Sequence, residues 1–174
     1  MLLPDTSPFW RWQEEYRPAV FLLALSGGRD SMALLQALTL QRARLGAPLV
    51  ACYIDHGWSA AGADWGAFCQ RGVPCDIVKL DWADGGGNAE ARARTLRYQA
   101  LAARLPPRGV LLTAHHRDDQ AETFLLQALR GSGLDGLAAM PARRALAGGE
   151  HWRPLLDVPR AAIEDFVAAQ GVAY

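Results

Sequence analysis

The chain has 174 residues, of which 51% are hydrophobic and 21% charged, and its formal net charge at pH 7 is zero. This length and composition are typical of one globular domain and exclude a disordered chain. The apolar runs are too short to cross a membrane and Leu2-Leu3-Pro4 is too short for a signal peptide, so we expect a cytoplasmic protein without a membrane partner. Proteins that hold nucleic acid mainly by charge are usually basic, so this chain should supply little of the affinity for any RNA.

The three cysteines, Cys52, Cys69 and Cys75, contain no Cys-x-x-Cys pair. An odd number without such a pair argues against a disulfide framework and against a zinc or iron–sulfur site. We interpret Cys52 as a core residue of a strand, and the other two either as buried small apolar residues or as residues without a role.

The elements alternate between helix and strand along the chain. An amphipathic helix is predicted over residues 4–17, a buried strand over Ala19–Leu25, and a crossover helix over Ser31–Leu45 that Gly46 closes. The following elements continue the alternation: strand Leu49–Ile54, helix Ala60–Gln70, strand Val73–Leu80, loop 81–87, a helix from Asn88 to about Arg104, strand Val110–Ala114, helix Asp118–Leu129 and helix Pro159–Ala169.

The segment between the last two helices is less regular. Residues 138–147 read as a short helical or irregular piece, and Gly148-Gly149 reads as a tight turn compatible with a hairpin toward His151–Leu156. Residues 172–174 are typical of the start of a further strand.

Strands that alternate with helices through short links predict an α/β fold, a three-layer open parallel sheet with helices on both faces. Ligands of such sheets bind beyond the carboxyl ends of the strands. The polar residues that could take part in a reaction lie at these predicted strand ends: Ser26–Ser31, Asp55–Gly57, Asp81–Asn88 and His115–Asp119.

The loop SGGRDS at 26–31 follows the first strand and precedes a helix. This arrangement directs free backbone N–H groups at an anion, and Gly27 and Gly28 allow close approach of the backbone. A capped strand-to-helix turn is the simpler alternative. The loop lacks the Gly-Lys-Ser/Thr end of a Walker A motif and the third glycine of a dinucleotide fingerprint. Asp30 beside a phosphate would repel it unless Mg²⁺ lies between them.

Two histidines and three acids follow the strand that ends at Ala114, in the motif HHRDDQAET at 115–123. A helix would present Asp118, Asp119 and Glu122 on one side. Each acid alone is also explained by the helix dipole, which favours carboxylates in a first turn. The adjacent histidines favour a functional site, and Mg²⁺ fits it better than Zn²⁺, because neighbouring histidine side chains diverge.

Several arginines are further candidates. Arg94 and Arg97 share one face of their helix and could bind a phosphate or a substrate carboxylate, although a solvated face explains them equally well. Arg130 precedes Gly131-Ser132-Gly133, which reads either as a second anion loop or as a plain turn. Arg153, in the segment RPLL, is interpreted as structural, with a substrate contact as the alternative.

The loop SGGRDS resembles the pyrophosphate loop (PP-loop) of the ATP pyrophosphatases, and the motifs together resemble the N-terminal catalytic domain of the tRNA(Ile)-lysidine synthetases. The resemblance rests on these segments: SGGRDS at 26–31, DHG at 55–57, Asn88-x-Glu90 with Ala93-Arg94-x-x-Arg97-Tyr98, HHRDDQAETFLL at 115–126, RGSGLDGLAAM at 130–140 and RPLL at 153–156. It implies an adenine nucleotide alpha hydrolase-like fold for a single domain over 1–174, without the family's C-terminal tRNA-binding domains.

The resemblance also implies a reaction. ATP adenylates the C2 oxygen of the wobble cytidine in an isoleucine tRNA with a CAU anticodon, and free lysine then displaces AMP to form lysidine. Such an enzyme is a ligase that forms a carbon–nitrogen bond, with ATP and Mg²⁺ as cofactors and tRNA(Ile) and lysine as partners. A homodimer is compatible with the sequence, which does not determine the oligomeric state.

The roles implied by motif position are as follows: Asp30, Arg94, His115, His116, Asp119 and Glu122 in catalysis; Ser26, Gly27, Gly28, Arg29, Asp30 and Ser31 in ATP binding; Arg97, Asp118, Arg130 and Ser132 in substrate binding; Asp30 and Asp119 as metal ligands. A tRNA thiolase of the 2-thiocytidine type is one alternative, but it needs suitably placed cysteines. A PP-loop synthetase that takes ammonia would not explain HHRDDQAET. A non-catalytic ATP-binding module would not need clustered acids.

Overall fold

One sheet organises the described part of the chain, residues 1–55, 73–80, 89–131, 133 and 137–174 of a computed structural model. Six strands lie in the order β3-β2-β1-β4-β6-β5. Their bounds are β1 Phe21–Leu25, β2 Leu49–Asp55, β3 Cys75–Lys79, β4 Val110–Leu112, β5 Arg143–Leu146 and β6 Gly149–Trp152. The central strand β1 pairs in parallel with β2 and β4, and only the edge pair β5–β6 is antiparallel. The predicted open parallel sheet is therefore confirmed, with one antiparallel strand added at its edge.

Helices connect the strands as the alternation predicts. Their bounds are α1 Pro8–Tyr16, α2 Arg29–Leu40, the short 3-10 helix η1 Arg42–Arg44, α4 Ala89–Ala102, α5 Arg117–Leu129 and α7 Arg160–Gln170. The expected helix 60–70, the loop 81–87 and the cap Asn88 lie outside the described residues. Gly46 does not close α2, because that helix already ends at Leu40; the N–H of Gly46 instead donates to the side chain of Gln13 at 3.1 Å.

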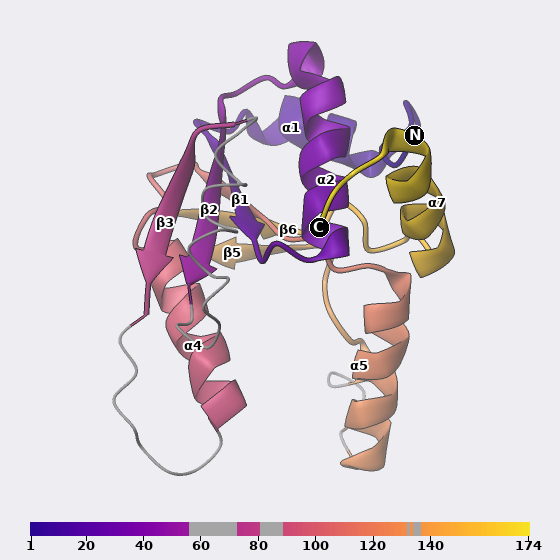
Figure 1. Cartoon of the computed structure of the whole chain (residues 1–174). Coiled ribbons are helices and arrows are strands. Elements are labelled where there is room, and N and C mark those ends of the chain that lie inside the picture. The colour runs from indigo at the N-terminus through magenta and orange to yellow at the C-terminus, as the bar shows by residue number, and fades with distance from the viewer. Residues whose placement is uncertain (56–72, 81–88, 132, 134–136) are drawn as a thin grey trace.

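Each face of the sheet has its own hydrophobic core. On one face, α1, α2 and α7 cover alternate residues of β1 such as Phe21 and Leu23, and several rings gather around the buried Trp152. On the other face, Leu101 of α4 packs with Leu22, the intervening residue of β1. This alternation of side chains between two faces is the property of strands that gives the three layers of Figure 1.

The hairpin of β5 and β6 fills residues 143–152, where the sequence suggested an irregular piece before the turn. The turn lies at Ala147-Gly148, one residue earlier than expected, and Ala147 has a φ of 50°. Gly149 must be glycine, because a Cβ there would lie 2.0 Å from the carbonyl oxygen of Gly109 on the neighbouring chain segment. The residues 172–174 form no strand.

The helices α4 and α5 extend beyond the carboxyl ends of the strands, with a space between them (Figure 1). No residue of α5 is buried, and large apolar side chains such as Phe124 and Leu129 are exposed by 45% and 84%. Among the described helices, none combines the length and the hydropathy that crossing a bilayer requires. The carboxyl ends of the strands, where ligands of parallel sheets usually bind, therefore face the space between these two helices.

Candidate active site

The loop after β1 turns the chain directly into α2. Gly27 is buried with a φ of 76°, and α2 begins two residues later at Arg29, earlier than the expected Ser31. The first helical hydrogen bond runs from the N–H of Met32 to the carbonyl of Gly28. The N–H groups of the first turn therefore have no helical partner and are directed toward the end of the sheet.

Two serine hydroxyls hold this loop closed. Ser31 Oγ donates to the carbonyl oxygen of Gly28 at 2.9 Å and accepts from the N–H of Ser26 at 3.3 Å. Ser26 Oγ lies 3.1 Å from Ser31 Oγ and accepts from the N–H of Gly28 at 3.3 Å. The loop is thus pre-shaped by its own side chains.

Arg29, in the first turn of α2, contacts two carboxylates. Its Nε donates to Asp30 Oδ1 at 2.8 Å, and its Nη1 donates to Glu164 Oε1 of α7 at 2.6 Å. The bond to Asp30 raises the pKa of the guanidinium. Arg29 therefore joins α2 to α7, and its assignment to ATP binding stays a prediction.

Asp30 and Asp119 come together on either side of the buried imidazole of His116. His116 Nε2 lies 3.7 Å from Asp30 Oδ2, and its Nδ1 lies 3.7 Å from Asp119 Oδ2. Asp119 Oδ2 also accepts the backbone N–H of His116 at 2.8 Å, which fixes the carboxylate at the start of α5. Two acids that are far apart in the sequence are thus brought to one place.

The neighbouring acid Asp118 also lies 3.8 Å from His116 Nδ1, but it has a second partner in α7. Its Oδ2 accepts the N–H of Arg160 at 2.9 Å, at the first residue of α7, and this bond lowers its pKa. Asp118 therefore ties α5 to α7, and it is not among the residues that line the cavity described next.

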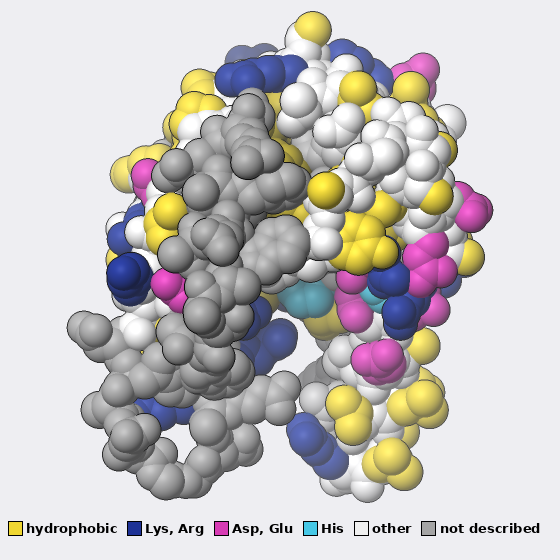
Figure 2. Space-filling view, in the orientation of Figure 1, with side chains coloured by type: hydrophobic (Ala, Val, Ile, Leu, Met, Phe, Trp, Pro, Cys, Tyr) yellow, Lys and Arg dark blue, Asp and Glu magenta, His cyan; other side chains and the backbone are white. Residues whose placement is uncertain are grey.

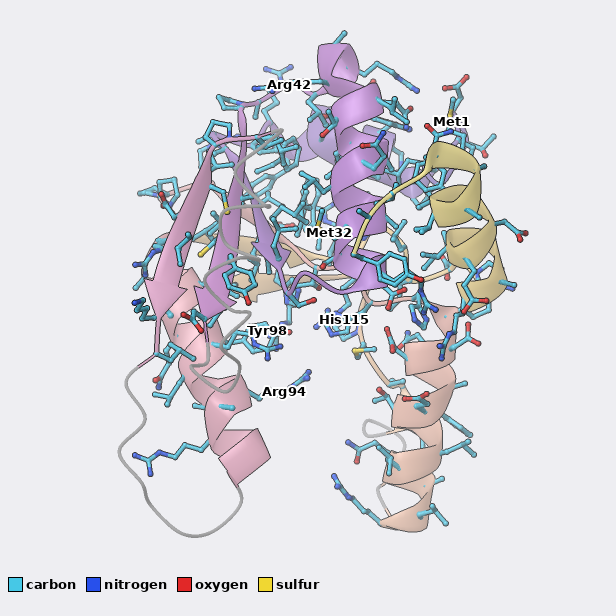
Figure 3. All side chains as sticks on the ribbon, viewed as in Figure 1. Met1, Met32, Arg42, Arg94, Tyr98 and His115 are labelled. Carbon is cyan, nitrogen blue, oxygen red and sulfur yellow. The ribbon has the colours of Figure 1, made fainter. Side chains whose placement is uncertain are left out.

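A cavity of about 260 Å³ opens between the loop, the ends of β1 and β2, and α4. Figure 3 shows Arg94 and Tyr98 of α4 and His115 of the segment after β4 at this end of the sheet. Its lining residues are Ala24, Leu25, Ser26, Asp30, Ser31, Tyr53, Ile54, Arg94, Arg97, Tyr98, Leu101, Thr113, Ala114, His115 and Asp119. Seven of the fifteen predicted site residues therefore line one cavity: Ser26, Asp30, Ser31, Arg94, Arg97, His115 and Asp119.

His115 is linked to the interior of the sheet through Thr113. Thr113 Oγ1 lies 2.8 Å from His115 Nδ1 and 2.8 Å from His151 Nε2 on β6. Burial, with the nearby charge of Arg153, lowers the pKa of His115 to about 4 and that of His151 to about 2. Both rings are therefore neutral at pH 7.

A second cavity of about 630 Å³ adjoins the first and shares Arg94 and Tyr98 with it. Arg144 and Arg153 also line it, and its described lining contains no carboxylate. Arg153 is only 3% exposed, its Nη1 donates to the carbonyl of Pro141 at 2.5 Å, and burial lowers its pKa. Figure 2 shows the hollow between α4 and α5, with Lys/Arg and His side chains at its rim. Such a cavity is suited to an anion.

Other predicted residues lie elsewhere. Glu122 is exposed on α5 and Arg130 is exposed at its end, and neither is among the described residues that line these two cavities. Ser132, like His56 and Gly57 of DHG, lies outside the described residues. Cys52 is fully buried, as predicted for a core residue, and Cys75 is partly buried; Cys69 is not described.

The sequence did not single out Thr113, His151 or Arg144 as site residues. Thr113 and His115 follow β4 two positions apart, and in an extended chain such residues lie on the same side, which was a usable signal. His151 and Arg144 could not be found in this way, because their nearness to His115 depends on the order of the strands.

Asp30 and Asp119 offer carboxylate oxygens beside the loop, the type of ligand that Mg²⁺ takes in proteins. Mg²⁺ usually takes one or two carboxylates and completes its shell with water and substrate phosphates. Within the described residues, no three His, Cys, Asp or Glu side chains form a cluster that could hold a metal by themselves. A metal ion held by either carboxylate would therefore need further ligands from water or from a bound phosphate.

Comparison with known proteins gives matches over nearly the whole chain. Residues 6–174 match the family model described as "PP-loop domain". The chain is 44% identical over 163 residues to a tRNA(Ile)-lysidine synthase of Xanthomonas campestris and 47% identical over 153 residues to one of Pseudomonas aeruginosa. These alignments cover 90% and 84% of this chain but only 38% and 34% of the two relatives.

A solved structure has the same fold. The U34-tRNA thiolase of Methanococcus maripaludis, determined with its 4Fe–4S cluster, superposes with a TM-score of 0.74 at 17% identity. The superposition covers 99% of this chain and 65% of that protein. At this identity the likeness concerns the fold alone.

Proposed function

We propose a function from one premise: the chain belongs to the PP-loop domain family. Membership supports ATP use, and the similarity to tRNA(Ile)-lysidine synthases supports the more specific proposal. The chain is the catalytic PP-loop part of a lysidine synthetase, a cytoplasmic ligase that joins free lysine to the wobble cytidine of tRNA(Ile). The observation that carries the proposal is the meeting of the loop, Asp30, Asp119 and His115 around one cavity.

In the first step, the C2 oxygen of the cytidine attacks the α-phosphorus of ATP, and the bond to pyrophosphate breaks. The unpaired N–H groups at the start of α2, with Ser26 and Ser31, would bind the departing pyrophosphate. Asp30 and Asp119 would hold Mg²⁺, which would neutralise phosphate charge. Arg94 and Arg97 reach the cavity from α4 and would bind a phosphate.

In the second step, the side-chain amine of lysine attacks C2, AMP leaves, and the amine gives up a proton. Asp119 lines the cavity, and a carboxylate there would orient the amine and accept that proton. Glu122 is one turn further along α5 and exposed, so it takes no part in this proposal. The arginines of the second cavity would bind anionic groups of the tRNA or the lysine carboxylate.

The first experiment compares Asp119→Asn with the adjacent Asp118→Asn by calorimetric titration of ATP with and without Mg²⁺. Asp119→Asn should weaken binding in Mg²⁺ about tenfold or more, because a metal ligand is lost. Asp118→Asn is the matched control, since Asp118 caps α7. Equal affinities for both variants and the unaltered chain would refute the site.

The second experiment tests the reaction. A chimera in which residues 6–174 replace the matching part of the Pseudomonas aeruginosa relative should release pyrophosphate and incorporate labelled lysine into tRNA(Ile). The same chimera with Asp30→Asn should lose both activities. ATP binding without pyrophosphate release would instead favour a non-catalytic ATP-binding module.

A thiolase is the second candidate because its fold is shared. Sulfur transfer needs reactive cysteine, yet Cys52 lies wholly inside the sheet, where burial raises the pKa of its thiol to about 11. Sulfur in the tRNA product, rather than lysine, would support this candidate.

A further inference from the structure

A chain of hydrogen bonds runs from the surface arginine Arg144 to His115 in the cavity. Arg144 Nε lies 3.2 Å from His151 Nδ1, and His151 Nε2 lies 2.8 Å from Thr113 Oγ1. Thr113 Oγ1 in turn lies 2.8 Å from His115 Nδ1. His151 is fully buried and Thr113 is 8% exposed, so water has little access to the middle of this chain.

The direction of each bond follows from Arg144, which can only donate. His151 Nδ1 must therefore accept, which leaves the ring proton on Nε2. That Nε2–H donates to Thr113 Oγ1. The hydroxyl then has one hydrogen to place, and among the described residues its only acceptor is His115 Nδ1. A buried hydroxyl that donated nowhere would be costly.

His115 Nδ1 is thus an acceptor, and the proton of the neutral ring lies on Nε2. This nitrogen has no hydrogen-bond partner among the described residues, and His115 lines the cavity beside Ser26 and Asp119. We propose that Arg144, His151 and Thr113 are positioning residues that hold His115 as its Nε2–H tautomer, a hydrogen-bond donor to an oxygen of the bound nucleotide.

The assignment separates the roles of His115 and Asp119. A ring whose free nitrogen carries the proton can stabilise a phosphoryl or carbonyl oxygen but cannot accept the amine proton there. Asp119 is then the proton acceptor of the second step. This division of roles rests on the proposed function, whereas the tautomer does not.

The tautomer is tested by NMR of the chain with ¹⁵N-labelled histidine, since N–H and lone-pair ring nitrogens give distinct signals. Four histidines are present, and His115→Gln identifies the signals of residue 115. In the unaltered chain we expect the proton of His115 on Nε2. A proton on Nδ1, or on both nitrogens at pH 7, would overturn the proposal.

Thr113→Val removes the hydroxyl while keeping the side-chain shape, and we expect a mixture of His115 tautomers. Thr113→Ser keeps the donor and should retain the single Nε2–H form. Thr39→Val is the matched control, because the hydroxyl of Thr39 bonds within α2 to the carbonyl of Leu35. An unchanged single tautomer in Thr113→Val would overturn the positioning role. If Thr113→Val failed to fold, the signals of the other histidines would change as well, and Arg144→Ala would then take its place as the test variant.

In the chimera, pyrophosphate release should fall about tenfold for Thr113→Val, the worth of one hydrogen bond of ordinary strength. Thr113→Ser should recover it, and Thr39→Val should leave it unaltered. Absence of lysine transfer in every chimera, with the NMR results as expected, would refute the proposed function and leave the tautomer assignment standing. An equal rate for Thr113→Val and Thr113→Ser would overturn the role of the tautomer in the reaction.

Discussion

His151 shows how the surroundings of one residue set its charge. The ring is fully buried on β6, and burial together with the positive charges of Arg153, Arg144 and Arg94 lowers its pKa to about 2. Since its ordinary pKa is about 6.5, folding keeps it neutral where the unfolded chain would bind a proton.

This shift has a direction that unfolding experiments can measure. Below pH 6.5 the unfolded chain takes up a proton at His151 and the folded chain does not, so the free energy of unfolding falls as pH falls. From pH 6 to pH 5 this residue should cost about 1 kcal/mol of stability. His151→Gln, which can accept and donate the same bonds without titrating, should show a shallower decline in urea unfolding. Parallel declines for the two proteins would contradict this.

Cys52 is a second buried residue with a shifted pKa. Burial in β2 raises the pKa of its thiol to about 11, so almost no thiolate forms at pH 8. We expect an alkylating reagent to leave Cys52 unmodified in the folded chain and to modify it fully in denaturant, as measured by peptide mass spectrometry. Rapid labelling of the folded chain at Cys52 would contradict its placement and strengthen the thiolase alternative.

At the scale of elements, the junction of β1 and α2 depends on two glycines in different conformations. Gly27 has a φ of 76°, whereas Gly28 has a φ of −76° and a Cβ there would meet only Ser26 Oγ at 3.4 Å. An L side chain is strained only in the first case.

Gly27→Ala should therefore lower the free energy of unfolding by about 1–2 kcal/mol, the cost of a left-handed conformation for alanine. Gly28→Ala should change it little, and it serves as the matched control. Both are measured by denaturant unfolding of the chain without ligand. Equal losses of stability for the two variants would contradict the backbone geometry of the loop.

The sequence predicted these elements well where a local signal exists. Buried runs of apolar residues located β1 and β4, and the glycine turn located the loop. It failed at β5, because Arg143 and Arg144 lie on an edge strand whose polar residues hide the two-residue period. It also placed Gly46 at the end of α2, because a glycine after a helical pattern is typical of a helix end. The actual partner of the Gly46 N–H is Gln13 of α1, a contact between distant segments that no local pattern contains.

At the scale of the whole molecule, the site depends on contacts that no single segment predicts. The sequence correctly predicted that Ser26, Asp30, His115 and Asp119 follow the ends of strands. The general rule for parallel sheets, that the carboxyl ends of the strands meet at one edge, then predicted that these residues lie close together. It could not place His151 beside Thr113, because that contact requires β6 to follow β4 in the sheet. It likewise did not separate Asp118, whose carboxylate accepts a hydrogen bond from the start of α7, from Asp119, whose carboxylate lines the cavity.

The zero net charge conceals an uneven distribution of charge. Three arginines line the second cavity at the end of the sheet, and no described carboxylate lines it. An RNA loop that bound there would contact about three positive charges, while the rest of the chain would offer no net attraction. We therefore expect weak binding of tRNA by this chain, weaker than its binding of ATP, but with a salt dependence set by the cavity.

If three phosphates of a single-stranded loop are neutralised there, the logarithm of the association constant should fall with the logarithm of salt concentration with a slope of about −2. Arg144→Ala should make this slope shallower in titrations with a tRNA(Ile) anticodon stem-loop. Arg42→Ala is the matched control, since Arg42 is an exposed arginine at the opposite end of the molecule (Figure 3). If both variants lowered the slope equally, RNA would be bound by charge spread over the surface, and the second cavity would have no special part in holding the anticodon loop against the adenylating site.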